Sequence, residues 1–234
     1  MPRTWPLLLL AAFLSACSSP PETVQTHLDR GRGFLAAGDT AAAIAAFRLA
    51  LDRDSLNVVS LAELGRIYAH QGKANAADIY LRRALDLTYQ RGLRALQAGD
   101  TVAATAAFEH TLEIYPPHPL ALIRLGELCL ATGREEKALE YFTSATQANP
   151  DYPEGFIKLG QLYARRQRPR EAQLAFERAI ELNINAIDAY LGLGELQRRQ
   201  ENWKAAAEQF AKALLIDPRS PAAREALEQL QRHL

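Results

Sequence analysis

The stretch Leu122–Pro150, LIRLGELCLATGREEKALEYFTSATQANP, contains two amphipathic segments separated by Gly133. The first segment carries Leu125-Gly126, and the second carries Ala138 and, four residues later, Phe142. A period of 20 to 50 residues is typical of repeat proteins, whose units stack side by side, so a recurrence of this pattern would predict a repeat array. The pattern does recur around six glycines, and four of the five separations between successive glycines are 34 residues. These glycines are Gly31, Gly65, Gly92, Gly126, Gly160 and Gly194.

This pattern resembles the tetratricopeptide repeat, a helix–turn–helix unit of 34 residues. The resemblance covers about residues 24 to 220 and implies an all-α, right-handed solenoid of six repeats. Small residues such as Gly126 let two helices approach closely, while large residues such as Phe142 fill the space beside them. Residues 221–234 read as one more amphipathic helix, which we expect to cap the last apolar face.

One step of the repeat is short, because only 27 residues separate Gly65 from Gly92. From Ala74 to Ala98 there is no proline, and Gly92 is the only glycine. The missing seven residues are close to two helical turns, so their loss keeps a helix in phase. We therefore expect one continuous helix of 25 residues and a break between two lobes, residues 24–84 and 85–220. The alternative is a tight turn near Thr88.

The first residues read as a targeting segment. Arg3 precedes an apolar run that is too short to span a bilayer, and the run ends in Leu14-Ser15-Ala16-Cys17. This ending resembles a bacterial lipobox, which implies a signal peptide over residues 1–16, a lipid on Cys17 and a short linker over residues 17–23. Ser18 after the cysteine implies, by the same resemblance, the outer membrane with the protein facing the periplasm. The alternative is an ordinary cleaved signal.

The composition argues against several classes of function. The 27 basic and 27 acidic residues balance, which disfavours nucleic acid as a partner. The histidines show no metal-ligand spacing with one another or with Cys129, which we expect to be a buried thiol. Gly33-x4-Gly38-Asp39-Thr40 has the outline of a phosphate-binding loop but carries Asp39 where the lysine belongs. We expect no metal, no cofactor and no catalytic activity.

The resemblance places one position of each first helix in a concave groove. That row is Leu28, Ala62, Tyr89, Ile123, Ile157 and Leu191, with Arg124, Glu127, Lys158 and Glu195 as a mixed-charge rim. An apolar strip with a charged rim suits an amphipathic helix or an extended peptide. The alternative is that the row is buried between successive first helices. The Lys and Asn residues with which some members of the family bind a C-terminal carboxylate are absent from the matching positions.

The sequence therefore predicts a membrane-anchored scaffold of the bacterial cell envelope that binds a peptide or helix of partner proteins and resembles outer-membrane tetratricopeptide lipoproteins. The alternative is an accessory subunit of an envelope export system, or of polysaccharide or pilus assembly, with carbohydrate or anionic-ligand binding. Exposed aromatic residues in the groove would favour the alternative, but Trp203 lies on a second helix. The basic pairs Arg165-Arg166 and Arg198-Arg199 either stabilise helix ends or face an anionic partner.

Overall fold

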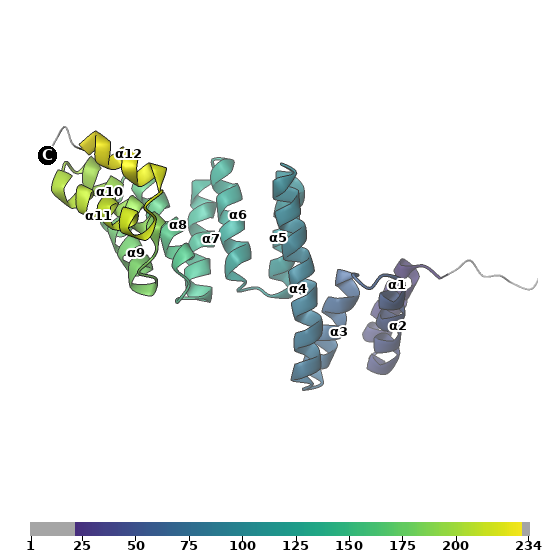
Figure 1. Ribbon diagram of the computed structural model, residues 1–234. Helices are drawn as coiled ribbons and strands as arrows, with labels where there is room; N and C mark the ends of the chain where they lie inside the picture. Colours follow the sequence, from purple (N-terminus) through teal and green to yellow (C-terminus); the bar gives the residue numbers. More distant parts are fainter. Residues whose placement is uncertain (1–21, 231–234) are drawn as a thin grey trace, which may run out of the picture. The chain divides into compact units, whose positions relative to one another are not determined.

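The computed structural model describes residues 22–230, so the signal peptide, Cys17 and most of the linker lie outside the described residues. Within that range the chain forms α-helices and no strand (Figure 1). The helices are α1 (Val24–Ala36), α2 (Thr40–Arg53), α3 (Val58–His70), α4 (Ala74–Gln97), α5 (Thr101–Ile114), α6 (Pro119–Ala131), α7 (Glu135–Ala148), α8 (Pro153–Arg165), α9 (Pro169–Leu182), α10 (Ile187–Arg199), α11 (Trp203–Ile216) and α12 (Pro221–Leu230).

Helix α4 joins what would otherwise be two separate helices. It runs unbroken for 24 residues, which confirms the expected fusion of the second helix of repeat two with the first helix of repeat three. Thr88 lies inside this helix and is buried, so the alternative of a tight turn there is wrong. The chain divides into two compact units, and the boundary between them falls within α4, between Leu87 and Thr88.

The N-terminal unit packs α1 against α2 and α3 against the first half of α4. Its core includes Phe47 and Leu64, which are fully buried, and Tyr68, whose ring stacks on that of Tyr80 at a centroid distance of 5.6 Å. The hydroxyl of Tyr68 also accepts a hydrogen bond of 2.8 Å from Arg48. Aromatic stacking and this bond to a charged donor hold α2, α3 and α4 together.

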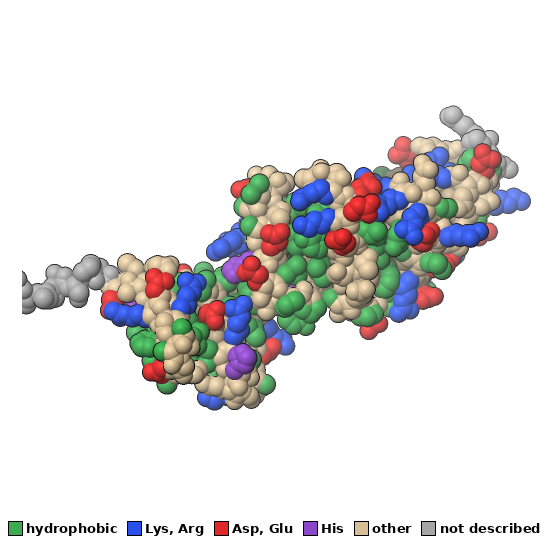
Figure 2. Space-filling view, turned by 180° about the vertical axis from the view of Figure 1, so that it is seen from behind, with side chains coloured by type: hydrophobic (Ala, Val, Ile, Leu, Met, Phe, Trp, Pro, Cys, Tyr) green, Lys and Arg blue, Asp and Glu red, His purple; other side chains and the backbone are tan. Residues whose placement is uncertain are grey.

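The C-terminal unit contains three regular helical hairpins, α6–α7, α8–α9 and α10–α11, preceded by the pair formed by the end of α4 and α5. Helix α12 packs on α11, where Leu230 joins a cluster with Ala206 and Phe210. This contact covers the apolar face of the last hairpin, as a solenoid end requires. On the face drawn in Figure 2, basic and acidic side chains are interspersed, with hydrophobic side chains between them.

In five of the six repeats a glycine on the first helix packs against a phenylalanine on the second. A Cβ atom placed on Gly126 would lie 2.4 Å from Cε1 of Phe142, closer than two carbon atoms can approach. The phenylalanine rings at this position are fully or almost fully buried, so the helices meet at the distance that only glycine allows. The same contact recurs at Gly31 with Phe47, Gly92 with Phe108, Gly160 with Phe176, and Gly194 with Phe210, while Gly65 meets Leu81.

The turns inside the repeats adopt the left-handed backbone conformation. Four of them use glycine, at Gly38, Gly72, Gly99 and Gly133, with φ between 71° and 77°. A glycine in this conformation is a common end of an α-helix, and here it ends the first helix of each of these repeats. In the last two repeats the equivalent residues are Gln167 and Glu201, with φ of 56° and 61°. For a residue other than glycine, this left-handed backbone conformation costs roughly 1–2 kcal/mol.

Candidate partner-binding surface

The predicted apolar row lies mostly in the core. Leu28 and Ile157 are 5% exposed and Ile123 is 2% exposed, while Tyr89 and Leu191 are partly buried. Ile123 and Ile157 pack in two successive apolar clusters of the C-terminal unit. Ala62 is 3% exposed as well, so four of the six side chains stabilise the array and do not form an exposed apolar strip, since a partner could reach them only by separating the helices.

The expected charged rim exists in part, because Arg124, Glu127 and Lys158 lie together. Arg124 Nη1 is 2.7 Å from Glu127 Oε2, and Lys158 Nζ, from the next first helix, is 2.7 Å from Glu127 Oε1. Lys158 is also 3.4 Å from Glu154 one helical turn away. Sequence reasoning missed Glu154, although its i,i+4 spacing to Lys158 is visible in the sequence. These four residues, the α6–α8 cluster, join two first helices that are adjacent in space.

The α6–α8 cluster keeps its charges at neutral pH. Burial by itself would raise the pKa of Glu127, but hydrogen bonds from Lys158 and Arg124 and the charges of both outweigh it, so the pKa lies below its ordinary value. Burial would likewise lower the pKa of Lys158, and the hydrogen bond and charge of Glu127 raise it instead. The cluster thus presents fixed charges of both signs in a half-buried setting, where they are screened less than exposed pairs.

Aromatic side chains flank the α6–α8 cluster. Tyr89 lies beside Arg124, and its ring is 5.5 Å from those of Phe108 and His118. His118 Nδ1 accepts a hydrogen bond of 3.1 Å from the backbone N–H of Ala121 and so caps the start of α6. Among the described residues Nε of Arg124 is buried without a hydrogen-bond partner. The guanidinium is therefore held by Glu127 and by its neighbours' packing rather than by a complete set of bonds.

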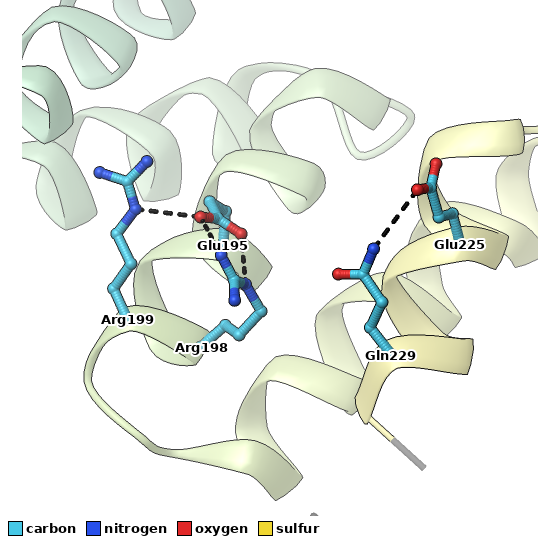
Figure 3. Close-up of polar contacts among 5 residues, drawn as sticks. All are labelled: Glu195, Arg198, Arg199, Glu225 and Gln229. Atoms are coloured by element: carbon cyan, nitrogen blue, oxygen red, sulfur yellow. Dashed lines mark hydrogen bonds and ion pairs between the residues drawn. The ribbon is translucent and has the colours of Figure 1, made fainter. Parts of the chain in front are cut away.

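Glu195, the fourth predicted rim residue, belongs to a separate group on α10. Its carboxylate accepts two hydrogen bonds from Arg198, of 2.7 and 2.8 Å, and one of 3.0 Å from Nε of Arg199 (Figure 3). Hydrogen bonds from Arg198 lower the pKa of Glu195 although burial opposes this. In Figure 3 the two arginines approach the carboxylate from different sides, and α12 carries the neighbouring pair Gln229–Glu225.

A pocket of about 350 Å³ opens between α8 and α10 beside Glu195. Besides Glu154, sequence reasoning missed this pocket. Its only signal in the sequence is Gly192, an additional glycine two residues before Gly194. The lining residues are Gln161, Ala164, Arg165, Phe176, Gly192, Glu195, Leu196 and Arg199.

Residues 22–230 also include Cys129 and Trp203, two residues about which the sequence makes particular predictions. Cys129 is a free, buried thiol, as expected from its place in the repeat. Over this range no group of three or more His, Cys, Asp or Glu residues is placed to hold a metal ion, and no helix is both long and apolar enough to cross a bilayer. Trp203 is partly buried against the cluster of Ala206, Phe210 and Leu230, so its ring is not presented as a stacking platform.

Comparison with known proteins identifies the repeats directly. One family model described as tetratricopeptide repeat matches residues 28–88 and 157–224, which is more than half of the chain, and a second with the same description matches residues 95–162. Comparison with curated protein sequences gives no match.

Two solved structures resemble the fold. The APC/C hetero-tetramer Cut9-Hcn1 is 17% identical with a TM-score of 0.57, and the match covers 91% of this chain but only 43% of that one. PilW, a type IV pilus biogenesis factor, is 18% identical with a TM-score of 0.53, covering 87% of this chain and 98% of that one. At these identities the likeness concerns the fold alone.

Tetratricopeptide arrays are binding scaffolds whose stacked helices present extended surfaces to protein or peptide partners. The helical hairpins, the glycine–phenylalanine contacts and the family matches all agree on the same architecture. The chain therefore belongs to the tetratricopeptide repeat family, as an all-α solenoid of six helix–turn–helix repeats and a C-terminal capping helix, with a fused helix between repeats two and three.

Proposed function

We propose that this protein is a non-catalytic scaffold of the bacterial cell envelope that is anchored by a lipid on Cys17 and binds protein partners through the face formed by α6, α8 and α10. The observation that carries the binding proposal is the α6–α8 cluster. Its four residues come from two successive first helices and remain partly accessible, with side chains that are 21% to 37% exposed. The membrane anchor rests on the lipobox-like sequence around Cys17.

The burial of the apolar row defines the partner's chemistry. Because Ile123 and Ile157 are inside, the accessible part of this face consists mainly of charged and aromatic side chains. A partner segment that binds there needs charges of both signs at a matching spacing rather than a purely apolar surface. An amphipathic helix or an extended peptide of mixed charge meets this requirement. The partly desolvated ion pairs are the energetic anchors of this contact, and they fix register as well as affinity.

The envelope location is tested by changing Cys17 to Ala. We expect the wild-type protein to carry an acylated N-terminal cysteine in mass spectra and to sediment with outer membranes. The Cys17→Ala variant should lose both properties because it has no site for the lipid. An unmodified N-terminus downstream of Cys17 in the wild-type protein would refute the anchor.

The binding face is tested by capture from detergent-solubilised envelopes with the tagged full chain. Lys158→Met removes the charge that links α8 to Glu127 but keeps an aliphatic stem of similar length. Lys137→Met is the matched control, because Lys137 lies on the second helix α7, where it faces the ring of Tyr141. Wild type and Lys137→Met should capture the same partner, and Lys158→Met should capture much less. Equal capture by a folded Lys158→Met variant would exclude this face.

A further inference from the structure

The last repeat departs from its neighbours at one position of its first helix. In repeats four and five this position holds Arg124 and Lys158, and each side chain reaches toward the preceding first helix, to Tyr89 and Glu127 respectively. In repeat six it is Gly192, which has no side chain to span the space between α10 and α8. A Cβ atom at this position would lie 2.4 Å from Cζ of Phe176, so α10 approaches the phenylalanine more closely than a larger residue would permit.

A pocket lies beside Gly192, between α8 and α10. The apolar part of its lining comprises Ala164, Leu196 and Phe176. A volume of about 350 Å³ lies at the small end of the range for ligand sites, which suits one side chain of a partner better than a whole small molecule. The pocket thus offers an apolar anchor point on a face that is otherwise charged.

Charged side chains line the pocket beside its apolar residues. Arg165 is paired with Glu135 of α7 at 2.8 Å, and Arg199 is paired with Glu195, which also binds Arg198. Arg199 uses only Nε to reach Glu195, and its side chain is 56% exposed. Figure 3 shows its two terminal nitrogens pointing away from that carboxylate, and among residues 22–230 no hydrogen bond engages them. A guanidinium with two free terminal nitrogens is suited to a carboxylate.

We propose that this pocket binds a partner segment in which an apolar side chain is followed or preceded closely by Asp or Glu. The apolar side chain enters between Ala164 and Leu196, and the carboxylate binds the terminal nitrogens of Arg199. This inference rests on the proposed function, because it specifies a partner motif for the same face of the C-terminal unit. It also assigns Gly192 a role, since a long side chain at that position would occupy the approach to Phe176.

The test uses a random-peptide library displayed on phage and selected on the immobilised full chain in detergent. Enriched peptides should share an apolar residue within two positions of Asp or Glu. For a synthetic copy of such a peptide, Arg199→Gln should weaken binding about tenfold or more, as loss of a charge-assisted pair implies. Replacing the acidic residue of the peptide by its amide should weaken binding to the wild type as much as Arg199→Gln does. The same change in the peptide should have little further effect on binding to the Arg199→Gln variant. Arg178→Gln, which removes an exposed arginine paired with Glu181 on α9, is the control and should bind as wild type.

A second variant separates the pocket from the charge. Ala164→Leu narrows the floor without altering Arg199 and should weaken the same peptide, while thermal melts confirm that both variants remain folded. Enrichment of peptides without an acidic residue, or unchanged binding by Arg199→Gln, overturns the proposal. Binding to phosphatidylglycerol vesicles is measured alongside. If no peptide is enriched and Arg199→Gln loses vesicle binding that the wild type shows, the proposal is overturned in favour of a lipid headgroup. If enriched peptides respond to Lys158→Met but not to Arg199→Gln, this pocket fails and the proposed function stands. If no peptide is enriched and no envelope partner is captured, both fail.

Discussion

Replacing Gly126 by alanine tests the contact that sets the distance between the two helices of a repeat. The new Cβ would lie 2.4 Å from Cε1 and 2.7 Å from Cδ1 of Phe142, whose ring is fully buried. Overpacking of this kind costs about 1–3 kcal/mol. Alanine gains up to about 1 kcal/mol over glycine in a helix. We therefore expect a net loss of roughly 1–2 kcal/mol in the free energy of unfolding, measured by urea denaturation followed by circular dichroism.

The double variant Gly126→Ala/Phe142→Ala tests whether the clash with the Phe142 ring causes this loss of stability. Phe142→Ala alone should cost about 3–5 kcal/mol, because it leaves a cavity. In that background Gly126→Ala no longer meets a ring and should stabilise the protein by up to about 1 kcal/mol. Gly33→Ala is the matched control, since Gly33 lies in α1 with no atom within 4 Å of its added Cβ, and it should be stabilising. Equal destabilisation by Gly126→Ala in both backgrounds would refute the reasoning.

Three further predictions follow from local geometry. Gln167→Gly and Glu201→Gly should each raise the free energy of unfolding by up to about 1 kcal/mol in urea titrations, because each residue has a positive φ that glycine adopts without strain. Arg48→Met should destabilise the N-terminal unit by about 1–2 kcal/mol in the same assay, because Arg48 donates a hydrogen bond to the buried Tyr68. His118→Asn should remove a pH dependence of the free energy of unfolding, because burial lowers the pKa of His118 below its ordinary 6.5. As the pH falls, the unfolded chain therefore takes up the proton first. The stability of the wild type should decrease below about pH 6.5, by at most about 1.4 kcal/mol per pH unit. Asn57 caps α3 at the equivalent position, so the variant keeps a cap that does not titrate; parallel stability curves for the two proteins between pH 7.5 and 5.5 would contradict this.

The helices could be predicted from the sequence because their determinants are local. Gly126 and Phe142 recur at a fixed spacing in five of the six repeats, and a run without a turn signal between Ala74 and Ala98 is sufficient to predict a continuous helix. The positive φ of Gln167 and Glu201 follows from the same alignment, since each stands 34 or 68 residues after Gly133. Alignment of the repeats therefore predicts a positive φ at residues whose own type would not indicate one.

The surface was harder to predict because it depends on how closely successive first helices approach. Ile123 and Ile157 have the same hydrophobicity whether they are exposed or buried, and only the packing of neighbouring hairpins decides. The pair between Lys158 and Glu127 joins residues 31 positions apart, so its register is set by tertiary contacts. The pocket is lined by residues of α8, α9 and α10, so it too depends on how neighbouring hairpins pack.

Site-specific photocrosslinking in intact cells tests the central claim, that partners bind the face formed by α6, α8 and α10. A photoreactive phenylalanine analogue at Gln161, an exposed residue of α8, should give discrete covalent adducts with an envelope protein. The same analogue at Leu174, which is 67% exposed on the second helix α9, should give none. Adducts from Leu174 alone, or from neither position with both variants folded and membrane-bound, would contradict the account.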